Sequence, residues 1–188
     1  MVEATSAGVA AGLIANGTTT IDDGARRCKL VHVETPAWRD IAVIDAVLLR
    51  DDHPGNLLPF DPDRLAHLVL TRAEPWAVGM SPIGGYLDPV GFDDDCGLAV
   101  RCGSGPGLQV PISPGLFREV RVEGSERLPF GRSVDFVGPG VVAFDGDREH
   151  VLADGETARV QVRRDGPWVV DIAGCIGRAA RDGLMSRR

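Results

Sequence analysis

Two stretches of the sequence carry polar groups in surroundings that suit chemistry. Asp45 lies inside the apolar run 41–50 (IAVIDAVLLR), and residues 81–86 (SPIGGY) place a hydroxyl beside a pair of glycines. A carboxylate among apolar side chains needs a partner or loses its charge. Backbone N–H groups at a glycine pair near the start of a helix can contact a phosphate or a ribose. These residues are therefore candidates for a ligand site.

Each candidate also has a purely structural interpretation. Asp45 can occupy an outward-facing or edge position of a strand, or bond to a neighbouring turn. Gly84 and Gly85 can form a turn between two strands, which the spacing alone favours because a P-loop lysine and a complete G-x-G-x-x-G are both missing. The stretch 103–107 (GSGPG) predicts a hairpin loop, since Pro106 lacks an N–H donor and no helix signal follows.

The sequence predicts neither a catalytic residue nor a metal site. The four histidines are scattered, and none lies beside an obvious serine or cysteine nucleophile. The four cysteines show no C-x-x-C spacing, so we expect reduced thiols without a metal. A hydrolase that uses Asp45, or a Ser/His pair formed only in space, is a further function class that nothing in the sequence selects.

Charge and hydropathy narrow the expected partners. The formal net charge is −7 and Lys29 is the single lysine, whereas binding to nucleic acid needs a basic face. No apolar run approaches membrane-spanning length, and Glu3 stands where a signal peptide has Lys or Arg. We therefore expect a cytoplasmic protein that binds neither nucleic acid nor membranes.

The elements that must position these residues are mostly strands. Hydrophobic residues make up 44% of the chain but aromatic residues only 5%, so the core consists of Val, Leu, Ile and Ala, which suits sheets. The 24 glycines and 13 prolines supply the turns between many short strands. The length of 188 residues predicts a single domain over residues 1–188.

The clearest strand pattern lies between residues 141 and 172. Three Asp-Gly pairs separate four β-prone runs there and predict a four-strand meander. The alternation of apolar and polar residues over 158–163 indicates a strand with one solvent-exposed face. The run 168–172 predicts a more buried strand. Helices are expected at 4–16 and 174–185. The predicted fold is mainly β and β-sandwich-like, with a short N-terminal helix and a C-terminal helix.

Several short motifs in this order resemble the C-terminal β domain of the NAD kinase superfamily, in particular its branch of acetoin-catabolism protein X. The motifs are RRCKLVHV, IAVIDAVLLR, GMSPIGGY, PISPG (111–115) and AFDGDREHVLADGETARVQV. The similarity extends over roughly residues 14–172. It implies an NAD kinase C-terminal-domain-like sandwich that binds a nucleotide.

The resemblance also implies where a ligand would bind. The Asn-acidic pair of the family falls on Ile44 and Asp45, so only the acid is kept, and its Arg-Gly-Asp-Gly stretch falls near residues 72–75 without the glycines. Its Thr-Pro-x-Gly-Ser-Thr-Ala-Tyr turn falls on residues 81–85, which keep the Pro and the first Gly. The ligand-binding residues implied in this way are Asp45, Glu74, Ser81, Gly84, Gly85 and Tyr86.

A catalytic half is missing from the sequence. The Gly-Gly-Asp-Gly motif of the family does not occur, and no α/β half precedes the β domain. We expect NAD or nucleotide binding with kinase (phosphotransferase) ancestry, with NAD and ATP as the candidate ligands, and a separate α/β kinase-like chain as a partner. The alternative is a non-catalytic oligomerisation or regulatory module, because members of the family self-associate through this domain.

Overall fold

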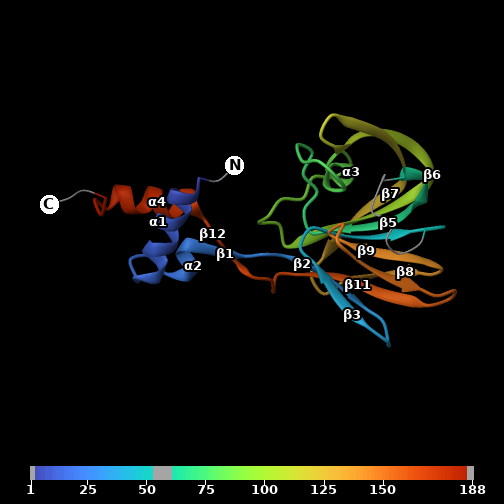
Figure 1. The fold of residues 1–188 in the computed structure, drawn as a ribbon, viewed down its shortest axis with the longest axis horizontal. Coiled ribbons are helices and arrows are strands. Elements are labelled where there is room, and N and C mark those ends of the chain that lie inside the picture. Colours follow the sequence, from blue (N-terminus) through green and yellow to red (C-terminus); the bar gives the residue numbers. More distant parts are fainter. Residues whose placement is uncertain (1–2, 53–60, 186–188) are drawn as a thin grey trace. The chain divides into compact units, whose positions relative to one another are not determined.

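The structure is a computed structural model that describes residues 3–52 and 61–185. The described residues form two compact units, one from the two ends of the chain (up to Cys28, and from Gly166) and one from Lys29–Asp165. The ribbon in Figure 1 shows their elements. None of the helices in the described ranges has the length and apolar character needed to cross a membrane.

Two antiparallel sheets build the larger unit. One has six strands in the order β10-β9-β4-β5-β6-β7, and the other has four in the order β3-β2-β11-β8. Their bounds are β2 (Leu30–Glu34), β3 (Arg39–Ala42), β4 (Asp45–Leu49), β5 (Leu65–Leu70), β6 (Cys96–Ser113), β7 (Leu116–Pro129), β8 (Ser133–Val137), β9 (Gly140–Phe144), β10 (Arg148–Leu152) and β11 (Thr157–Arg163). A short 3-10 helix, η1 (Pro62–Arg64), precedes β5.

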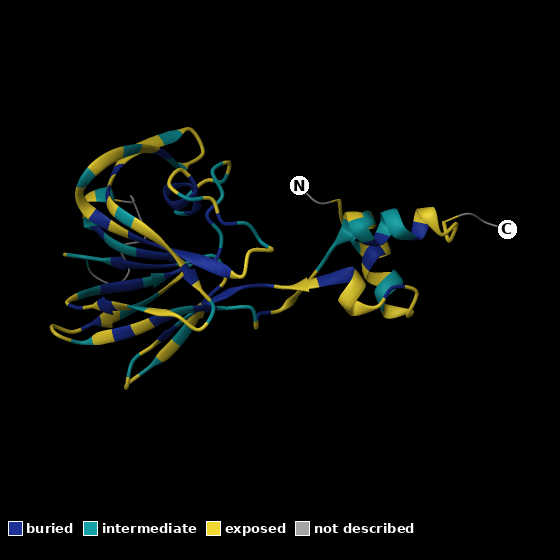
Figure 2. Cartoon of the chain, turned by 180° about the vertical axis from the view of Figure 1, so that it is seen from behind, coloured by how far each residue is buried: buried dark blue, intermediate teal, exposed yellow. Residues whose placement is uncertain are grey.

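The space between the two sheets is filled by small branched side chains and two phenylalanines. Val33 and Val160 of the four-stranded sheet pack against Leu48 and Phe144 of the six-stranded sheet, and all four are fully buried. Figure 2 shows the buried positions along both layers. The prediction of a mainly β, sandwich-like fold is confirmed, and so are the helices near the two ends.

A second core covers the other face of the six-stranded sheet. The helix α3 (Ser81–Gly85) packs there, with Ile83 against Leu70 and Leu98 of β5 and β6. Figure 1 shows the long strands β6 and β7 curving over this helix. Because the outer ends of β6 and β7 add Val110 and Val120 to the core, the sheet encloses α3 from both sides.

The predicted meander is wrong in its pairing, although its four strands exist. Only β9 and β10 form a hairpin, through Asp145-Gly146. The strand β11 pairs instead with β2 and β8 in the other sheet, and β12 (Trp168–Val170) pairs with β1 (Ala25–Arg27) in the smaller unit. The predicted burial of this last run is also wrong, since Trp168 and Val169 are 40% and 45% exposed. The alternation in β11 holds, because Ala158, Val160 and Val162 are fully buried.

Two further strand predictions need correction. The run 41–50 is not one strand but two, β3 and β4, interrupted at Val43 and Ile44. The stretch 103–107 is not a hairpin loop, since β6 continues through it and the pairing with β7 shifts register between Cys102 and Gly107. Gly105 allows this shift, because a Cβ there would lie 1.7 Å from the Val122 carbonyl oxygen. The hairpin turn follows at Ser113–Leu116 instead.

The smaller unit contains the helices α1 (Ala4–Ala15), α2 (Ile21–Gly24) and α4 (Ile172–Arg181) with the β1–β12 ribbon. The Asp171 carboxylate caps α4 by accepting a hydrogen bond from the Gly174 N–H at 3.0 Å. The i+4 spacing of Ile176, Ala180 and Leu184 predicts that these residues form the buried face of α4. This prediction is wrong, because the buried residues of α4 are Cys175 and Ala179, and Ala180 and Leu184 are exposed.

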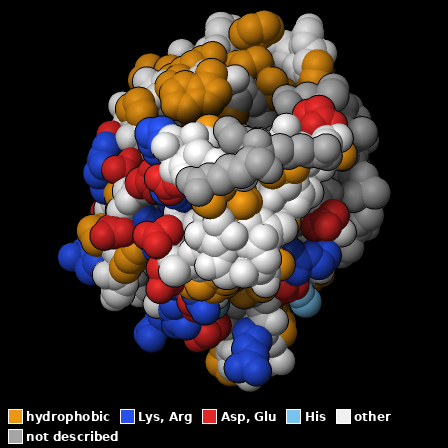
Figure 3. Space-filling view, turned by 90° about the vertical axis from the view of Figure 1, so that its left-hand side faces the viewer, with side chains coloured by type: hydrophobic (Ala, Val, Ile, Leu, Met, Phe, Trp, Pro, Cys, Tyr) orange, Lys and Arg blue, Asp and Glu red, His pale blue; other side chains and the backbone are white. Residues whose placement is uncertain are grey.

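Charged side chains of both signs lie on the face of the molecule that Figure 3 presents. On the face presented in Figure 3, arginine side chains lie among Asp and Glu instead of gathering into one basic area. This mixture accords with the net charge of −7.

Candidate functional site

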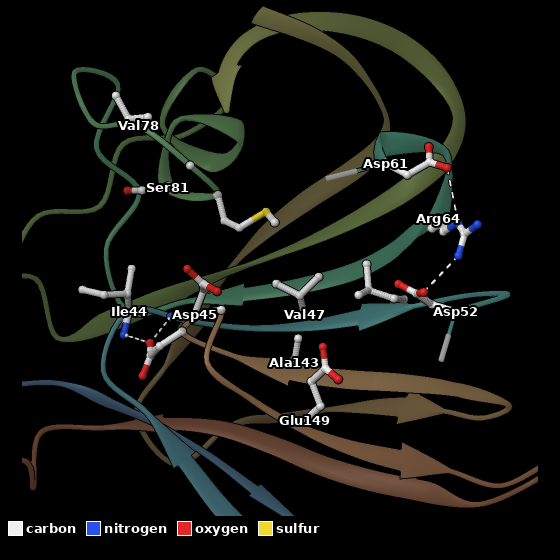
Figure 4. A pocket seen from close by; sticks show the side chains of 15 residues that line it. Ile44, Asp45, Val47, Asp52, Asp61, Arg64, Val78, Ser81, Ala143 and Glu149 are labelled. Carbon is white, nitrogen blue, oxygen red and sulfur yellow. Dashed lines mark hydrogen bonds and ion pairs between the residues drawn. The ribbon is translucent and has the colours of Figure 1, made fainter. Parts of the chain in front are cut away.

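A cavity of about 350 Å³ opens in the larger unit between β4, the β9–β10 turn and the segment before α3. Figure 4 shows its side chains. The residues that line it are Ile44, Asp45, Val47, Leu49, Asp52, Asp61, Arg64, Val78, Gly79, Met80, Ser81, Ala143, Asp145, Gly146 and Glu149. The volume lies at the lower end of the range for small-molecule sites, about 300–1,000 Å³.

Asp45, the first residue of β4, directs its carboxylate into this cavity. In Figure 4 the side chain extends from the strand toward the segment that carries Val78 and Ser81. Its carboxylate accepts no hydrogen bond from any residue that the structure describes. Burial, assisted by the negative charge of Asp145, raises the pKa of Asp45 to about 7. The cavity therefore contains an acceptor that no described residue of the protein uses.

Asp145 fixes the backbone around Asp45. Its carboxylate accepts hydrogen bonds from the backbone N–H groups of Val43 (2.8 Å), Ile44 (2.7 Å) and Asp45 (3.2 Å). Its own N–H donates to the Asp45 carbonyl at 3.1 Å, and its φ of 53° lies in the left-handed region. These bonds explain the interruption between β3 and β4, because the three N–H groups bond to a side chain rather than to a strand.

The lining of the cavity is mainly acidic. Its lining contains five carboxylates, of which Asp52 and Asp61 pair with the one lining guanidinium, that of Arg64, at 2.9 and 3.3 Å. Figure 4 shows these ion pairs at the end of the cavity remote from Asp45. Phosphate groups are repelled by such a lining, whereas hydroxyl and amide donors are favoured. Within residues 3–52 and 61–185, no group of acids, histidines and cysteines has the arrangement of a metal site.

Ser81 lies at the cavity wall, but its hydroxyl is already bonded within the chain. The hydroxyl donates to the Arg72 carbonyl and accepts from the Glu74 N–H, both at 2.9 Å. It thus joins the segment after β5 to the start of α3. The Glu74 carboxylate lies 3.6 Å from the Arg72 guanidinium and does not line the cavity.

The glycine pair serves the packing of α3. A Cβ at Gly84 would lie 2.5 Å from Leu70 Cδ1, and a Cβ at Gly85 would lie 2.5 Å from the Pro75 backbone nitrogen. The pair therefore forms neither a turn between strands nor a loop around a ligand, and both residues are buried in a five-residue helix. Tyr86 caps that helix, is 44% exposed and does not line the cavity.

Of the six sequence-predicted residues, the cavity brings together Asp45 and Ser81. Asp145 is the residue that the sequence reasoning missed as part of this site. Its signal was the Asp-Gly pair, which predicted a turn but not the contact with residues 43–45 about a hundred positions earlier.

Comparisons with known proteins cover the same part of the chain. The family described as acetoin catabolism protein X C-terminal domain matches residues 29–165, the range of the larger unit. Acetoin catabolism protein X of Cupriavidus necator is 36% identical over 153 residues, which are 78% of this chain and 42% of that protein. The chain thus spans about two fifths of the length of this relative. With the family match covering the whole sandwich, the chain belongs to the acetoin catabolism protein X C-terminal domain family.

Proposed function

We propose that this chain is a nucleotide-binding β domain of kinase ancestry and that the cavity at Asp45 takes the nucleoside part of NAD or ATP. One observation carries the proposal: a carboxylate with no hydrogen-bond partner among the described residues faces a cavity of small-molecule size. The two neighbouring hydroxyls of a ribose are donors that suit the two oxygens of Asp45. A hydrogen bond to a charged group contributes about 1.5–3 kcal/mol.

The charges of the lining support one orientation of the ligand. Because the acidic groups of the lining outnumber its one guanidinium and disfavour phosphate, the phosphates would lie outside the cavity while the ribose and its base enter it. The mainly apolar wall of Val47, Leu49, Val78 and Met80 suits the face of a base. The volume of about 350 Å³ suits one nucleoside rather than a complete dinucleotide.

Phosphoryl transfer is not proposed for this chain by itself. Transfer depends on groups that position the phosphates and a metal ion, and the sequence lacks the Gly-Gly-Asp-Gly motif. We propose that a kinase-like α/β part supplies those groups. The greater length of the Cupriavidus necator relative is compatible with such a part.

Calorimetry with NAD, NADP and ATP tests the proposal, using the wild type and two matched variants. Asp45→Asn removes the charge in the cavity, and Asp147→Asn removes a charge from the nearby β9–β10 turn, where that side chain is 72% exposed. We expect Asp45→Asn to weaken binding about tenfold, since a neutral hydrogen bond replaces a charged one. Asp147→Asn should bind like the wild type.

The pH dependence adds a second readout. Ribose hydroxyls bind the ionised carboxylate better, so affinity should rise as the pH increases through about 7 in the wild type and stay level in Asp45→Asn. A folded protein that binds none of the three nucleotides at millimolar concentration refutes the proposal. Equal affinity of the wild type and Asp45→Asn removes Asp45 from the site.

A further inference from the structure

A second cavity, of about 380 Å³, lies at the edge of the space between the two sheets. The strands β5, β6 and β7 form one side of it and β8 forms the other. It shares no lining residue with the cavity at Asp45. The two cavities are therefore separate places in the same unit.

Cross-strand pairing places a histidine and an arginine together in this cavity. His67 of β5 and Arg101 of β6 are directly opposite each other, as are Val69 and Ala99 two residues along. Since Val69 and Ala99 face the core between the sheets, His67 and Arg101 face the same side. Gly124 of β7 is opposite Arg101, and a Cβ there would lie 3.5 Å from Arg101 Nη2.

Neither side chain bonds to another residue in the part of the chain that the structure describes. Within the described ranges, the His67 ring and the Arg101 guanidinium form no hydrogen bond and no ion pair. The His67 ring contacts the ring of Phe136, edge to face at 5.7 Å between ring centres. Burial and then the charge of Arg101 lower the pKa of His67, so the imidazole is neutral at pH 7 and keeps one N–H donor. The cavity thus presents a guanidinium and an imidazole that the fold does not use.

An acidic group at the same cavity limits the charge of a ligand. Glu126 of β7 is opposite Ala99 and so faces the inner side, whereas Asp135 of β8 lies between the inward-facing Val134 and Phe136, so its carboxylate faces the other side of the sheet. A dianion such as phosphate would be attracted by the Arg101 guanidinium but repelled by the Glu126 carboxylate. A single carboxylate fits the planar fork of Arg101, and a donor group on the same molecule fits Glu126. Phe136 and Val134 offer a wall for a short carbon chain.

We propose that this second cavity binds a small monocarboxylate that also carries a hydrogen-bond donor, as α-hydroxy and α-amino acids do. The ligand carboxylate lies on Arg101 and His67, and its hydroxyl or ammonium group donates to Glu126. This site is independent of the nucleotide site proposed above. For a ligand of about six non-hydrogen atoms, a dissociation constant on the order of 1 mM is expected.

An NMR titration that follows the signals of the His67 imidazole nitrogens tests the proposal in the complete chain. The probes are L-lactate and L-alanine, with propionate as the analogue that lacks the donor and inorganic phosphate as the dianion. We expect saturable shifts of the His67 signals with lactate or alanine, weaker binding of propionate and none of phosphate. Which of lactate and alanine binds better identifies the donor group.

Substitutions in the second cavity test which side chains contact the ligand. Arg101→Gln should weaken binding of lactate and alanine at least tenfold, whereas Arg121→Gln, at an exposed arginine of β7, should leave it unchanged. Glu126→Gln should weaken lactate and alanine but not propionate. Arg101 is exposed, so its variant should fold, and urea unfolding of each variant checks this.

The outcomes are decisive in both directions. Absence of a saturable His67 shift, or a shift that Arg101→Gln leaves unchanged, overturns the site. Phosphate binding as tight as that of lactate overturns the monocarboxylate class. None of these results depends on whether the Asp45 cavity binds a nucleotide.

Discussion

Replacing Asp45 with Asn should make the protein more stable at alkaline pH. The Asp45 carboxyl has a folded-state pKa of about 7, compared with a usual value of 3.8, because it is buried and lies near Asp145. The folded state therefore binds a proton more tightly than the unfolded state does. Below a pH of about 4 the Asp45 carboxyl is protonated in both states and does not lower the free energy of unfolding. As the pH rises from about 4 to about 7, the unfolded state loses this proton first, so the free energy of unfolding falls progressively.

The magnitude follows from the difference between the two pKa values. The difference between a folded-state pKa of about 7 and the usual 3.8 corresponds to roughly 4 kcal/mol at pH 8, which is an upper limit because the side chain is only partly buried and water can enter the cavity. At pH 5 only the part of this difference that lies between 3.8 and the pH of the solution applies, or roughly 1.5 kcal/mol. The stabilisation by Asp45→Asn should therefore grow by about 1–3 kcal/mol between pH 5 and pH 8.

Urea unfolding followed by circular dichroism at pH 5, 6, 7 and 8 measures this growth. Asp147→Asn serves as the control, because its exposed carboxylate should give a difference that does not vary with pH. A difference between Asp45→Asn and the wild type that stays constant from pH 5 to pH 8 would refute the assigned burial of Asp45. Together with weaker nucleotide binding, a rise in stability would identify Asp45 as a residue kept for a ligand rather than for the fold.

Three further variants test the supports of the site and the fold. Lys29→Met should lower the free energy of unfolding by about 2–5 kcal/mol, because the ammonium donates to three carbonyls, of Gly91, Asp94 and Cys96, at 2.7–3.1 Å; an unchanged urea midpoint would contradict this. Gly85→Ala should cost about 1–3 kcal/mol, since its Cβ meets the Pro75 backbone, whereas Gly12→Ala in α1, with open space around it, should be neutral or stabilising in the same thermal melt. Asp145→Ala should cost about 2–4 kcal/mol by leaving three N–H groups unpaired, and calorimetry should show weaker nucleotide binding as well; full retention of both properties would remove its positioning role.

How well the sequence predicts a feature of this protein depends on how far apart in the chain the interacting residues lie. The four strands within residues 141–172, the alternation in β11 and the ends of α1 follow from neighbouring residues, and these were predicted. Strand pairing does not follow from neighbouring residues, because Ala158, Val160 and Val162 would be buried equally well in either sheet. The Asp-Gly signal at 154 marked a real turn between strands that then pair elsewhere, whereas the pair at 165 lies in an irregular connection between β11 and β12.

The candidate site shows the same division. The sequence by itself determined that Asp45 is a carboxylate in an apolar run, and hence that its charge needs an explanation. Only the tertiary structure decided that its oxygens face a cavity, that the Ser81 hydroxyl is bonded within the chain and that Gly84 and Gly85 serve packing. The physical reason is that each of these outcomes depends on atoms brought close by folding, such as the Asp145 carboxylate at residues 43–45, and no local pattern encodes that proximity.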